Sequence, residues 1–451
     1  MALFRSRAPY LNITLLGTMT VLAACARYAP AQLTVTDLGK PTVQTADLPG
    51  DADIHALLRM ALAHDPAVAA ARATLTAALS SQKAAHNLPP LSLTLTTEYS
   101  RDSDPQKPWL YGAAVGIPLD VGAKRATRVT STDLAVIRAR YALAEAVWVV
   151  RQNLHQALND LSLAQQDIDL NQTLLDQRLS YQSVMQARVS HGEDAQGLAA
   201  QAALDVSGAR QGLAQAETRK IQAVAALART LSTDPATAAS LPVRSDDPDA
   251  PTGAQLASMT DRALYCRADV LTAVVDYDIA ENDLRTAIAA QYPDINIQPG
   301  YTWERGAVKL PLSLSLTLPP LDGNRAAINA AQNTRLAAGK TLEDRVRTTR
   351  ATAIQAATTY AADATTARTI ADHDLPVLRD MADRAGRLAT AGETDQSEAL
   401  LARINATQAA LNLLQARRTA ATDRLTLEDA LHQSFDATDT QILTDAVKVQ
   451  P

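Results

Sequence analysis

Residues 310–318 read LPLSLSLTL and residues 91–99 read LSLTLTTEY. In both runs, apolar side chains alternate with small or polar ones, which is the side-chain period of a β-strand. Residues 109–117 and 295–303 alternate in the same way. Each run is about nine residues long, which suits a tilted strand that crosses a bilayer with one apolar and one polar face. The four runs predict membrane strands in a chain that is otherwise helical.

The apolar faces of these runs identify the side chains that we expect to contact lipid, namely Leu93, Leu95, Val115, Ile117, Ile297, Leu312, Leu314 and Leu316. Aromatic residues lie near the ends of the runs, where an interfacial belt would place them; they are Tyr99, Trp109, Tyr111, Tyr301 and Trp303. A soluble hairpin with one face on a core has the same period, and long alanine-rich helices alone would fit a soluble rod. Four matched runs, each flanked by long helical segments, favour membrane strands over both alternatives.

The longest helices are predicted to follow the strands. From about 124 to 190 the chain contains no glycine or proline, and its apolar residues recur at steps of three, four and seven, as in a coiled coil. The second long segment, about 324–388, contains Pro376, where we expect a kink or a local break.

Each long helix leads to a glycine, Gly192 or Gly392, which predicts a C-cap and a reversal into a shorter returning helix. The acidic residues beside these glycines are Glu193, Asp194 and Glu393. We expect them to cap the returning helices, because acids suit the positive end of a helix dipole.

This order of segments occurs twice, and Val68 corresponds to Val270 with an offset of about 200 residues. Each copy begins with a helix, expected at about 51–87 and 253–291. The pattern predicts a mainly α fold with a small β part, in two internal repeats. The expected divisions are a lipoprotein signal peptide at 1–24, an extended arm at 25–50, a first repeat at 51–231, a linker at 232–252, a second repeat at 253–435 and a tail at 436–451.

The N-terminus has the pattern of a targeting segment. Arg5 and Arg7 precede an apolar run that is too short to span a bilayer. The following Leu22-Ala23-Ala24-Cys25 resembles the bacterial lipoprotein box, which implies a lipid on Cys25; a plain secretory signal with an incidental cysteine is the alternative. The other cysteine is Cys266, so a lipidated Cys25 leaves no pair for a disulfide bond.

Composition argues against several classes of function. The net charge is −6 with both signs spread along the chain, and no basic run suggests nucleic acid as a partner. The seven histidines show no metal-ligand spacing, and the chain has no glycine-rich phosphate loop. We therefore expect no catalytic residue, no metal site and no cofactor. Beyond the targeting segment, no stretch approaches about 18 consecutive apolar residues, so any membrane insertion would have to use strands.

Four strands cannot close a barrel alone. Lipid leaves no open sheet edge satisfied, and known single-chain barrels begin at about eight strands. The strand count therefore predicts that several copies of the chain pool their strands in one barrel.

Nearly the whole mature chain resembles the TolC-type outer-membrane channels, specifically the efflux lipoproteins that serve tripartite pumps. The resemblance is carried by local signatures in both copies: His64-Asp65-Pro66-Ala67-Val68, Pro118-Leu119-Asp120-Val121-Gly122, Arg267-Ala268-Asp269-Val270, Tyr292-Pro293-Asp294-Ile295 and Pro320-Leu321-Asp322-Gly323-Asn324-Arg325. It implies a homotrimer with a twelve-stranded β-barrel in the outer membrane of a Gram-negative bacterium. A trimeric α-barrel of antiparallel coiled-coil helices would cross the periplasm. The implied function is passive export of small molecules, with a periplasmic adaptor protein, an inner-membrane transporter and outer-membrane lipid as partners.

The resemblance also suggests a gate, because acidic rings shortly after the second glycine turn often narrow the tunnel of this family. Glu398 occupies the place of one such acid, while Leu401 stands where a second is expected, so an acidic ring would be thinner here. The alternative is that Glu398 lies on a solvated helix face. Adaptor-contact candidates, by position at the turns alone, are Gly192, Glu193, Asp194, Gly392 and Glu393.

Two other functions stay open. A duct for type I protein secretion would share the architecture, although the lipoprotein box favours efflux. A periplasmic adaptor lipoprotein also presents a coiled-coil hairpin, but it would carry one hairpin flanked by soluble β domains, and the duplicated layout argues against that.

Replacing Cys25 with serine is expected to remove the lipid and to lower retention in the membrane fraction, because the acyl chains contribute to anchoring. Membrane fractionation measures retention, and metabolic labelling with a fatty acid measures lipidation. Unchanged retention and labelling would remove the anchor from the account.

Overall fold

The computed structural model describes residues 53–101, 108–242, 253–304 and 306–448, with side chains from 258 onward in the third of these ranges. They all lie in one compact unit of the chain, Val43–Pro451. The predicted signal peptide, Cys25 and the extended arm lie outside the described residues. Among the described helices, none is both long enough and apolar enough for a bilayer crossing.

The first repeat contains four main helices, α3 (Ile54–His64), α4 (Pro66–His86), α5 (Lys124–Ser190) and α6 (Gln196–Thr230). The bounds of α5 match the predicted long helix, but the single helix expected at 51–87 is two helices. Asp65 separates them, because its carboxylate accepts the N–H groups of Ala67 at 2.8 Å and Val68 at 3.0 Å as an N-cap. Pro66 then occupies the first helical position, where its missing N–H costs nothing.

The second repeat contains α8 (Gly253–Cys266), α9 (Ala268–Ala289), α10 (Arg325–Thr369), α11 (Leu375–Ala391) and α12 (Gln396–Leu431). The helix expected at 253–291 is again two, with a break at Arg267. Between α10 and α11 lies one π-helical turn, η2 (Ile370–Asp374), which ends two residues before Pro376. A proline removes one backbone donor, and a π turn is one way in which a helix absorbs the mismatch. The predicted local break therefore lies where it was expected.

Two short helices occupy segments expected to be irregular. Helix α7 (Pro235–Ala239) lies inside the predicted linker, and α13 (Ala437–Val447) occupies most of the predicted tail. Asp436 begins α13 by accepting the N–H of Thr438 at 2.7 Å. Ile442 of α13 joins a core formed mainly by α3, α4, α5 and α6, so this end of the chain is a packed part of the fold.

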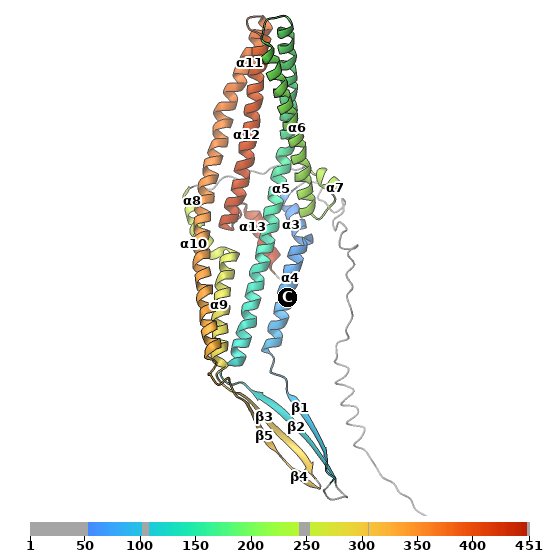
Figure 1. Ribbon diagram of the computed structural model, residues 1–451, viewed down its shortest axis with the longest axis vertical. Coiled ribbons are helices and arrows are strands. Elements are labelled where there is room, and N and C mark those ends of the chain that lie inside the picture. Colours follow the sequence, from blue (N-terminus) through green and yellow to red (C-terminus); the bar gives the residue numbers. More distant parts are fainter. Residues whose placement is uncertain (1–52, 102–107, 243–252, 305, 449–451) are drawn as a thin grey trace, which may run out of the picture. The chain divides into compact units, whose positions relative to one another are not determined.

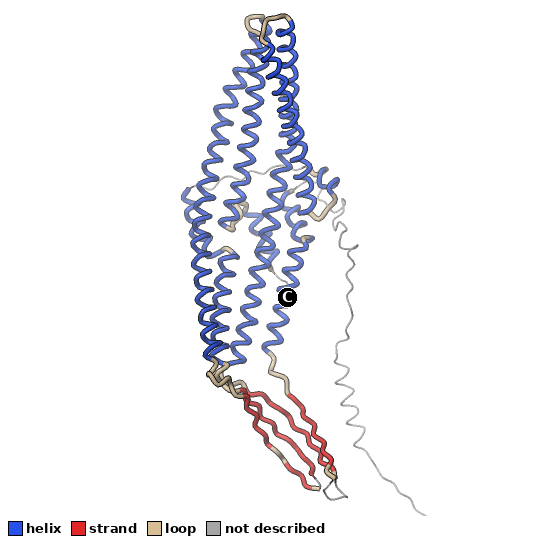
Figure 2. Tube along the Cα trace, viewed as in Figure 1, coloured by secondary structure: helices blue, strands red, loops and turns tan. Residues whose placement is uncertain are grey.

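The strands are β1 (Ser92–Tyr99), β2 (Trp109–Leu119), β3 (Asp294–Glu304), β4 (Ala307–Lys309) and β5 (Leu312–Thr317). They form one antiparallel sheet in which β1 pairs with β2, β2 with β3, and β3 with both β4 and β5. Figure 1 shows the strands grouped at one end of the long helices, and Figure 2 shows the same separation of helix and strand by colour. Each repeat therefore contributes one hairpin to a shared sheet.

The predicted fourth strand appears as two pieces, β4 and β5, because of proline. Both pieces keep one register on β3, with Val308 opposite Trp303 and Leu314 opposite Ile297. Between them Gly300 N donates to Pro311 O at 2.8 Å, but Pro311 has no N–H to donate in return. The two pieces are one strand with a missing ladder bond.

Three helices meet at a buried polar network centred on Arg151, which lies near the middle of α5. Its guanidinium donates to Glu428 of α12, to Asp439 of α13 at 2.9 Å and to Ser434 at 2.8 Å. Arg151, Glu428 and Asp439 are all essentially buried. Removing one member of such a set leaves an unpaired buried charge, which is strongly destabilising. The network therefore fixes how three helices meet.

His432 ends α12 in the left-handed conformation, with φ 51°. Its ring stacks on Trp148 at 4.5 Å between centroids, and Trp148 Nε1 donates to Asp429 at 2.8 Å. Burial, aided by the nearby positive charge of Arg267, lowers the pKa of His432 to about 4. The folded protein therefore holds this imidazole neutral.

Substitution His432→Asn is expected to reduce the loss of stability on acidification. The pKa of His432 is lower in the folded chain than its ordinary 6.5. Its stabilising contribution is thus complete above pH 6.5 and is lost as the pH falls toward 4, up to about 3 kcal/mol in all. Asparagine tolerates the left-handed conformation but does not titrate in this range.

The free energy of unfolding of both proteins, measured in detergent between pH 4 and 7, gives the difference. The same substitution at the exposed His373 controls for loss of a histidine. Parallel pH profiles for wild type and His432→Asn would contradict the buried neutral imidazole.

Candidate functional site

The sheet has two chemically distinct faces. Paired residues on neighbouring antiparallel strands share a face, and the register pairs Leu93 with Val115, and Ile297 with both Ile117 and Leu314. All eight residues that the sequence assigned to the apolar side lie on this one face. The leucines among them are largely exposed, with Leu95 at 73 % and Leu314 at 60 %. Such a contiguous apolar surface marks a contact with lipid or with another protein.

Aromatic rings continue the apolar face at the hairpin end of the sheet. Tyr99 meets Trp109 edge-on at 5.0 Å, and Tyr111 stacks against Trp109 and against Trp303, each at 6.1 Å. Tyr301, on the same face, is 48 % exposed. The predicted aromatic group is therefore a contiguous band across three strands, as at a membrane interface.

The opposite face is polar and sterically tight. It carries serine, threonine, asparagine and glutamine side chains alternating with small residues. A Cβ atom at Gly116 would lie 2.3 Å from Ser92 Oγ, and one at Gly112 would lie 3.3 Å from Thr302 Oγ1. Glycine at these positions leaves room for polar side chains of the neighbouring strands, so this face offers hydrogen-bonding groups to water.

The outer edges of the sheet are open. Among the described residues, β1 pairs only with β2, and β4 and β5 pair only with β3. The N–H and C=O groups along these two edges have no strand opposite them within the described chain. An open edge next to an apolar face is a template for a further strand.

At the other end of the long helices, both glycine turns have the predicted geometry. Gly192 and Gly392 have φ 75° and 73°. Glu193 N donates to Arg188 O and Glu393 N to Leu388 O, each at 2.9 Å. These are Schellman caps, which require a residue that tolerates positive φ.

The expectation that the acids beside these glycines cap the returning helices is wrong. The N-cap of α6 is Ala195, which offers no side-chain cap, and the N-cap of α12 is Asp395, whose carboxylate accepts Ser397 N at 3.1 Å. Asp194 is held instead by the side chain of Arg188. Glu193 lies 4.0 Å from the same guanidinium.

Arg188 connects the two turns, and the sequence reading missed it. Its Nε donates to Asp194 in its own turn, and its Nη1 donates to Asp395 in the other turn. The hydrogen bond that Arg188 donates to Asp194 raises the pKa of Arg188. Comparison of the two repeats could have identified this pair. The position of Arg188 is Leu388 in the second repeat, and the position of Asp395 is Ala195 in the first. Each repeat therefore has a charge where the other has an apolar residue, and the two charges are opposite.

Glu398 lies in the first turn of α12 and is exposed; its carboxylate accepts a hydrogen bond from Thr394 Oγ1. Leu401, one turn further along, is 37 % exposed. The predicted constriction residue is thus near the turn with its charge accessible. A solvated helix face would place it in the same way, so its role stays a prediction.

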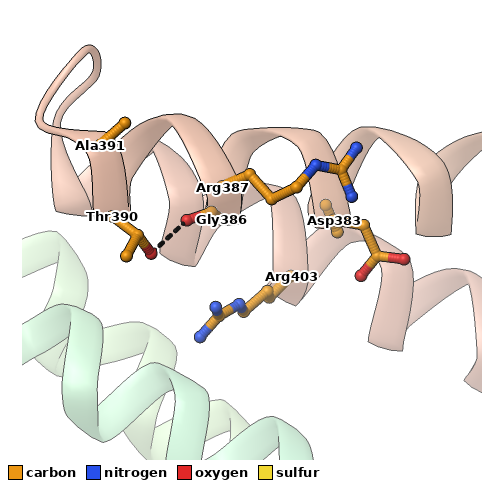
Figure 3. A pocket seen from close by; sticks show the side chains of 7 residues that line it. Asp383, Gly386, Arg387, Thr390, Ala391 and Arg403 are labelled. Atoms are coloured by element: carbon orange, nitrogen blue, oxygen red, sulfur yellow. Dashed lines mark hydrogen bonds between the residues drawn. The ribbon is translucent and has the colours of Figure 1, made fainter.

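A pocket of about 560 Å³ lies between α11 and α12 close to the same turn. Figure 3 shows that Arg387 and Asp383 come from one helix and Arg403 from the other. Thr390 Oγ1 donates to Gly386 O at 2.8 Å, and a Cβ at Gly386 would lie 3.1 Å from Arg403 Nη2. Cationic side chains therefore line the pocket with a single acid, and its lining contains no nucleophile–base pair.

Part of the chain is similar to a known protein family. Residues 57–233 match the model of the outer membrane efflux protein family. No curated protein sequence matches the chain.

Several solved structures have the same fold. The CmeC outer membrane channel of Campylobacter jejuni is 13 % identical with a TM-score of 0.69, covering 94 % of this chain and 98 % of that one. VceC, an outer membrane protein of Vibrio cholerae, is 18 % identical with a TM-score of 0.67, covering 86 % and 97 %. The MtrE outer membrane channel of Neisseria gonorrhoeae, solved in an open state, is 17 % identical with a TM-score of 0.65, covering 84 % and 89 %. The predicted fold class is confirmed.

The two faces of the sheet predict opposite responses to one added charge. Leu314→Arg places a cation on the apolar face, and should cost about 2–4 kcal/mol near the middle of a bilayer. Ser315→Arg, the neighbouring position on the polar face, is the matched control and should be tolerated. The yield of detergent-resistant oligomer in outer-membrane extracts measures the difference. Equal yields from both variants would mean that the apolar face does not meet lipid.

Proposed function

We propose that this protein is a TolC-type outer-membrane efflux channel, a passive conduit without enzymatic activity whose wall is built from three copies of the chain. The family match over residues 57–233 and the fold shared with solved outer-membrane channels support this proposal. The observation that carries the proposal is the open four-strand sheet with one apolar and one polar face. The sheet of one copy has the two faces of a barrel wall, but its outer edges are unpaired and it does not close.

Pooling strands satisfies the open edges. The β1 edge of one copy can pair with the β4–β5 edge of the next, which continues the antiparallel ladder and satisfies the backbone groups that lipid cannot. Three copies of a four-strand sheet give a twelve-stranded barrel, within the range of known membrane barrels. The apolar face then faces lipid, with the aromatic band near one interface.

The polar face supplies the path. Closing the barrel turns serine, threonine, asparagine and glutamine side chains toward a lumen that holds water. Such a channel lowers the barrier for polar solutes without covalent chemistry. The cargo is small molecules delivered from the periplasm or from an inner-membrane transporter, exported to the exterior of a Gram-negative bacterium.

The helix tips form the periplasmic entrance. Arg188 ties the two turns of one copy together, and three such pairs of turns would surround the axis. Glu398 then repeats as a ring of carboxylates, which attracts cations. A periplasmic adaptor docks on the exposed turns, at Gly192, Glu193, Asp194, Gly392 and Glu393. A lipid on Cys25 anchors the mature chain.

An adaptor lipoprotein fits the structure less well. Both repeats contribute strands to one sheet that has an exposed apolar face. An adaptor would instead need separate soluble β domains around a single hairpin.

Conductance in planar lipid bilayers tests the conduit. The purified mature protein is expected to give discrete conductance steps that multivalent cations block from the side of the helix tips. Glu398→Gln should weaken the block, because three carboxylates at the entrance lose their charge. Glu393→Gln, in the turn five residues before Glu398, is the matched control and should retain the block.

The absence of conductance from correctly assembled protein would reject the conduit. Equal block of wild type and Glu398→Gln would reject the acidic ring while leaving the conduit intact.

A further inference from the structure

A cluster of potential metal ligands joins the two ends of the described chain. His55, near the start of α3, places Nε2 2.7 Å from Asp436 Oδ2 and 3.9 Å from Asp439 Oδ1, both at the start of α13. The ligand atoms of these three residues all lie within 4.8 Å of one another. The cluster lies on α3 and α13, whereas the residues assigned above to the lumen and the gate lie on the strands and at the start of α12.

Asp439 points an unsatisfied oxygen into this cluster. The residue is 0 % exposed. Its Oδ2 accepts from Arg151 Nε at 2.9 Å and lies 2.8 Å from His155 Nε2. Its Oδ1 has no hydrogen-bond partner among the described residues. A buried carboxylate oxygen without a donor is costly, and a bound cation removes that cost.

The ring of His55 is oriented as a metal ligand would be. Nδ1 lies 3.2 Å from Asp53 Oδ1, while Nε2 faces Asp436. A neutral imidazole donates from one nitrogen only, so its proton can serve Asp53 or Asp436 but not both. A metal ion bound by Nε2 and the carboxylates would leave Nδ1–H to donate to Asp53. A carboxylate behind the distal nitrogen is the common outer-shell partner of metal-bound histidine.

The charges of the cluster point the same way. It gathers the carboxylates of Asp53, Glu428, Asp436 and Asp439. The guanidinium groups that face them are Arg151 and Arg59, the latter 3.9 Å from Asp53. These carboxylates outnumber the guanidinium groups that face them, and a divalent cation would offset the excess.

We propose that His55, Asp436 and Asp439 bind one divalent first-row metal ion, with Zn²⁺ as the best fit to one imidazole and two carboxylates. Water would complete a tetrahedral shell. Asp53 fixes the imidazole, and Arg151 and His155 hold the second oxygen of Asp439. The ion would connect α3 to α13, and Arg151 connects this site to α5 and α12. Its role is therefore structural and independent of transport. The ligands lie far apart in sequence, which is why their spacing predicted no metal site.

The test uses the full mature chain in detergent, stripped with a chelator and titrated with Zn²⁺ by calorimetry. Metal content is measured after dialysis, and Co²⁺ is used as an absorbing substitute. Wild type should take up one Zn²⁺ per chain and show visible Co²⁺ bands. Asp53→Asn should bind about 10–100-fold more weakly, as for other outer-shell partners.

The decisive variant is His55→Gln, which lies at a partly exposed site and should lose binding while it remains folded. His64→Gln, at the exposed end of the same helix, is the matched control and should bind like wild type. Asp445→Asn on α13 controls in the same way for a surface carboxylate. If wild type takes up no Zn²⁺, or if His55→Gln takes up as much, a proton on His55 satisfies the cluster and the metal site is rejected.

Discussion

The unpaired edges of the sheet constrain the rest of the molecule. In the proposed channel, the backbone N–H and C=O groups at the edges of β1 and β5 would have no water to bind in a bilayer. A further copy of the same sheet on each side would pair with these edges, while lipid would cover the exposed apolar face. The long helices would then run together from the barrel, and their far ends would meet around one axis.

The helical part is built to transmit this arrangement. Alanine occupies many of the buried positions in the coiled coils, so backbones approach closely. At mid-length, Arg151 fixes α5 against α12 and α13. At the tips, Arg188 joins the two turns of one chain by partly exposed ion pairs, which are individually weaker than buried ones. The strongest restraint is therefore buried at mid-length and the weakest lies at the end where an entrance would open.

The sequence predicted most of what depends on local periodicity. Alternation placed Leu93, Val115 and Leu314 on one face, and the register confirms that they share it. The absence of glycine and proline gave α5 its bounds. The capping residues were harder to predict. One helix was expected where α3 and α4 are separate, because the helical period continues across Asp65 and the break depends on its single carboxylate. The helix in the predicted tail was missed because it is short. Contacts between distant residues are not visible in local periodicity: the pairing of Arg188 with Asp395 shows only when the two repeats are compared, and that of His55 with Asp439 has no local signal.

The central claim is that one polypeptide holds only a third of a closed wall, and native mass spectrometry of the mature protein released from outer-membrane detergent extracts tests it most directly. The account predicts a single species with the mass of three chains that persists at low protein concentration. A monodisperse single chain that stays soluble after detergent removal would contradict it.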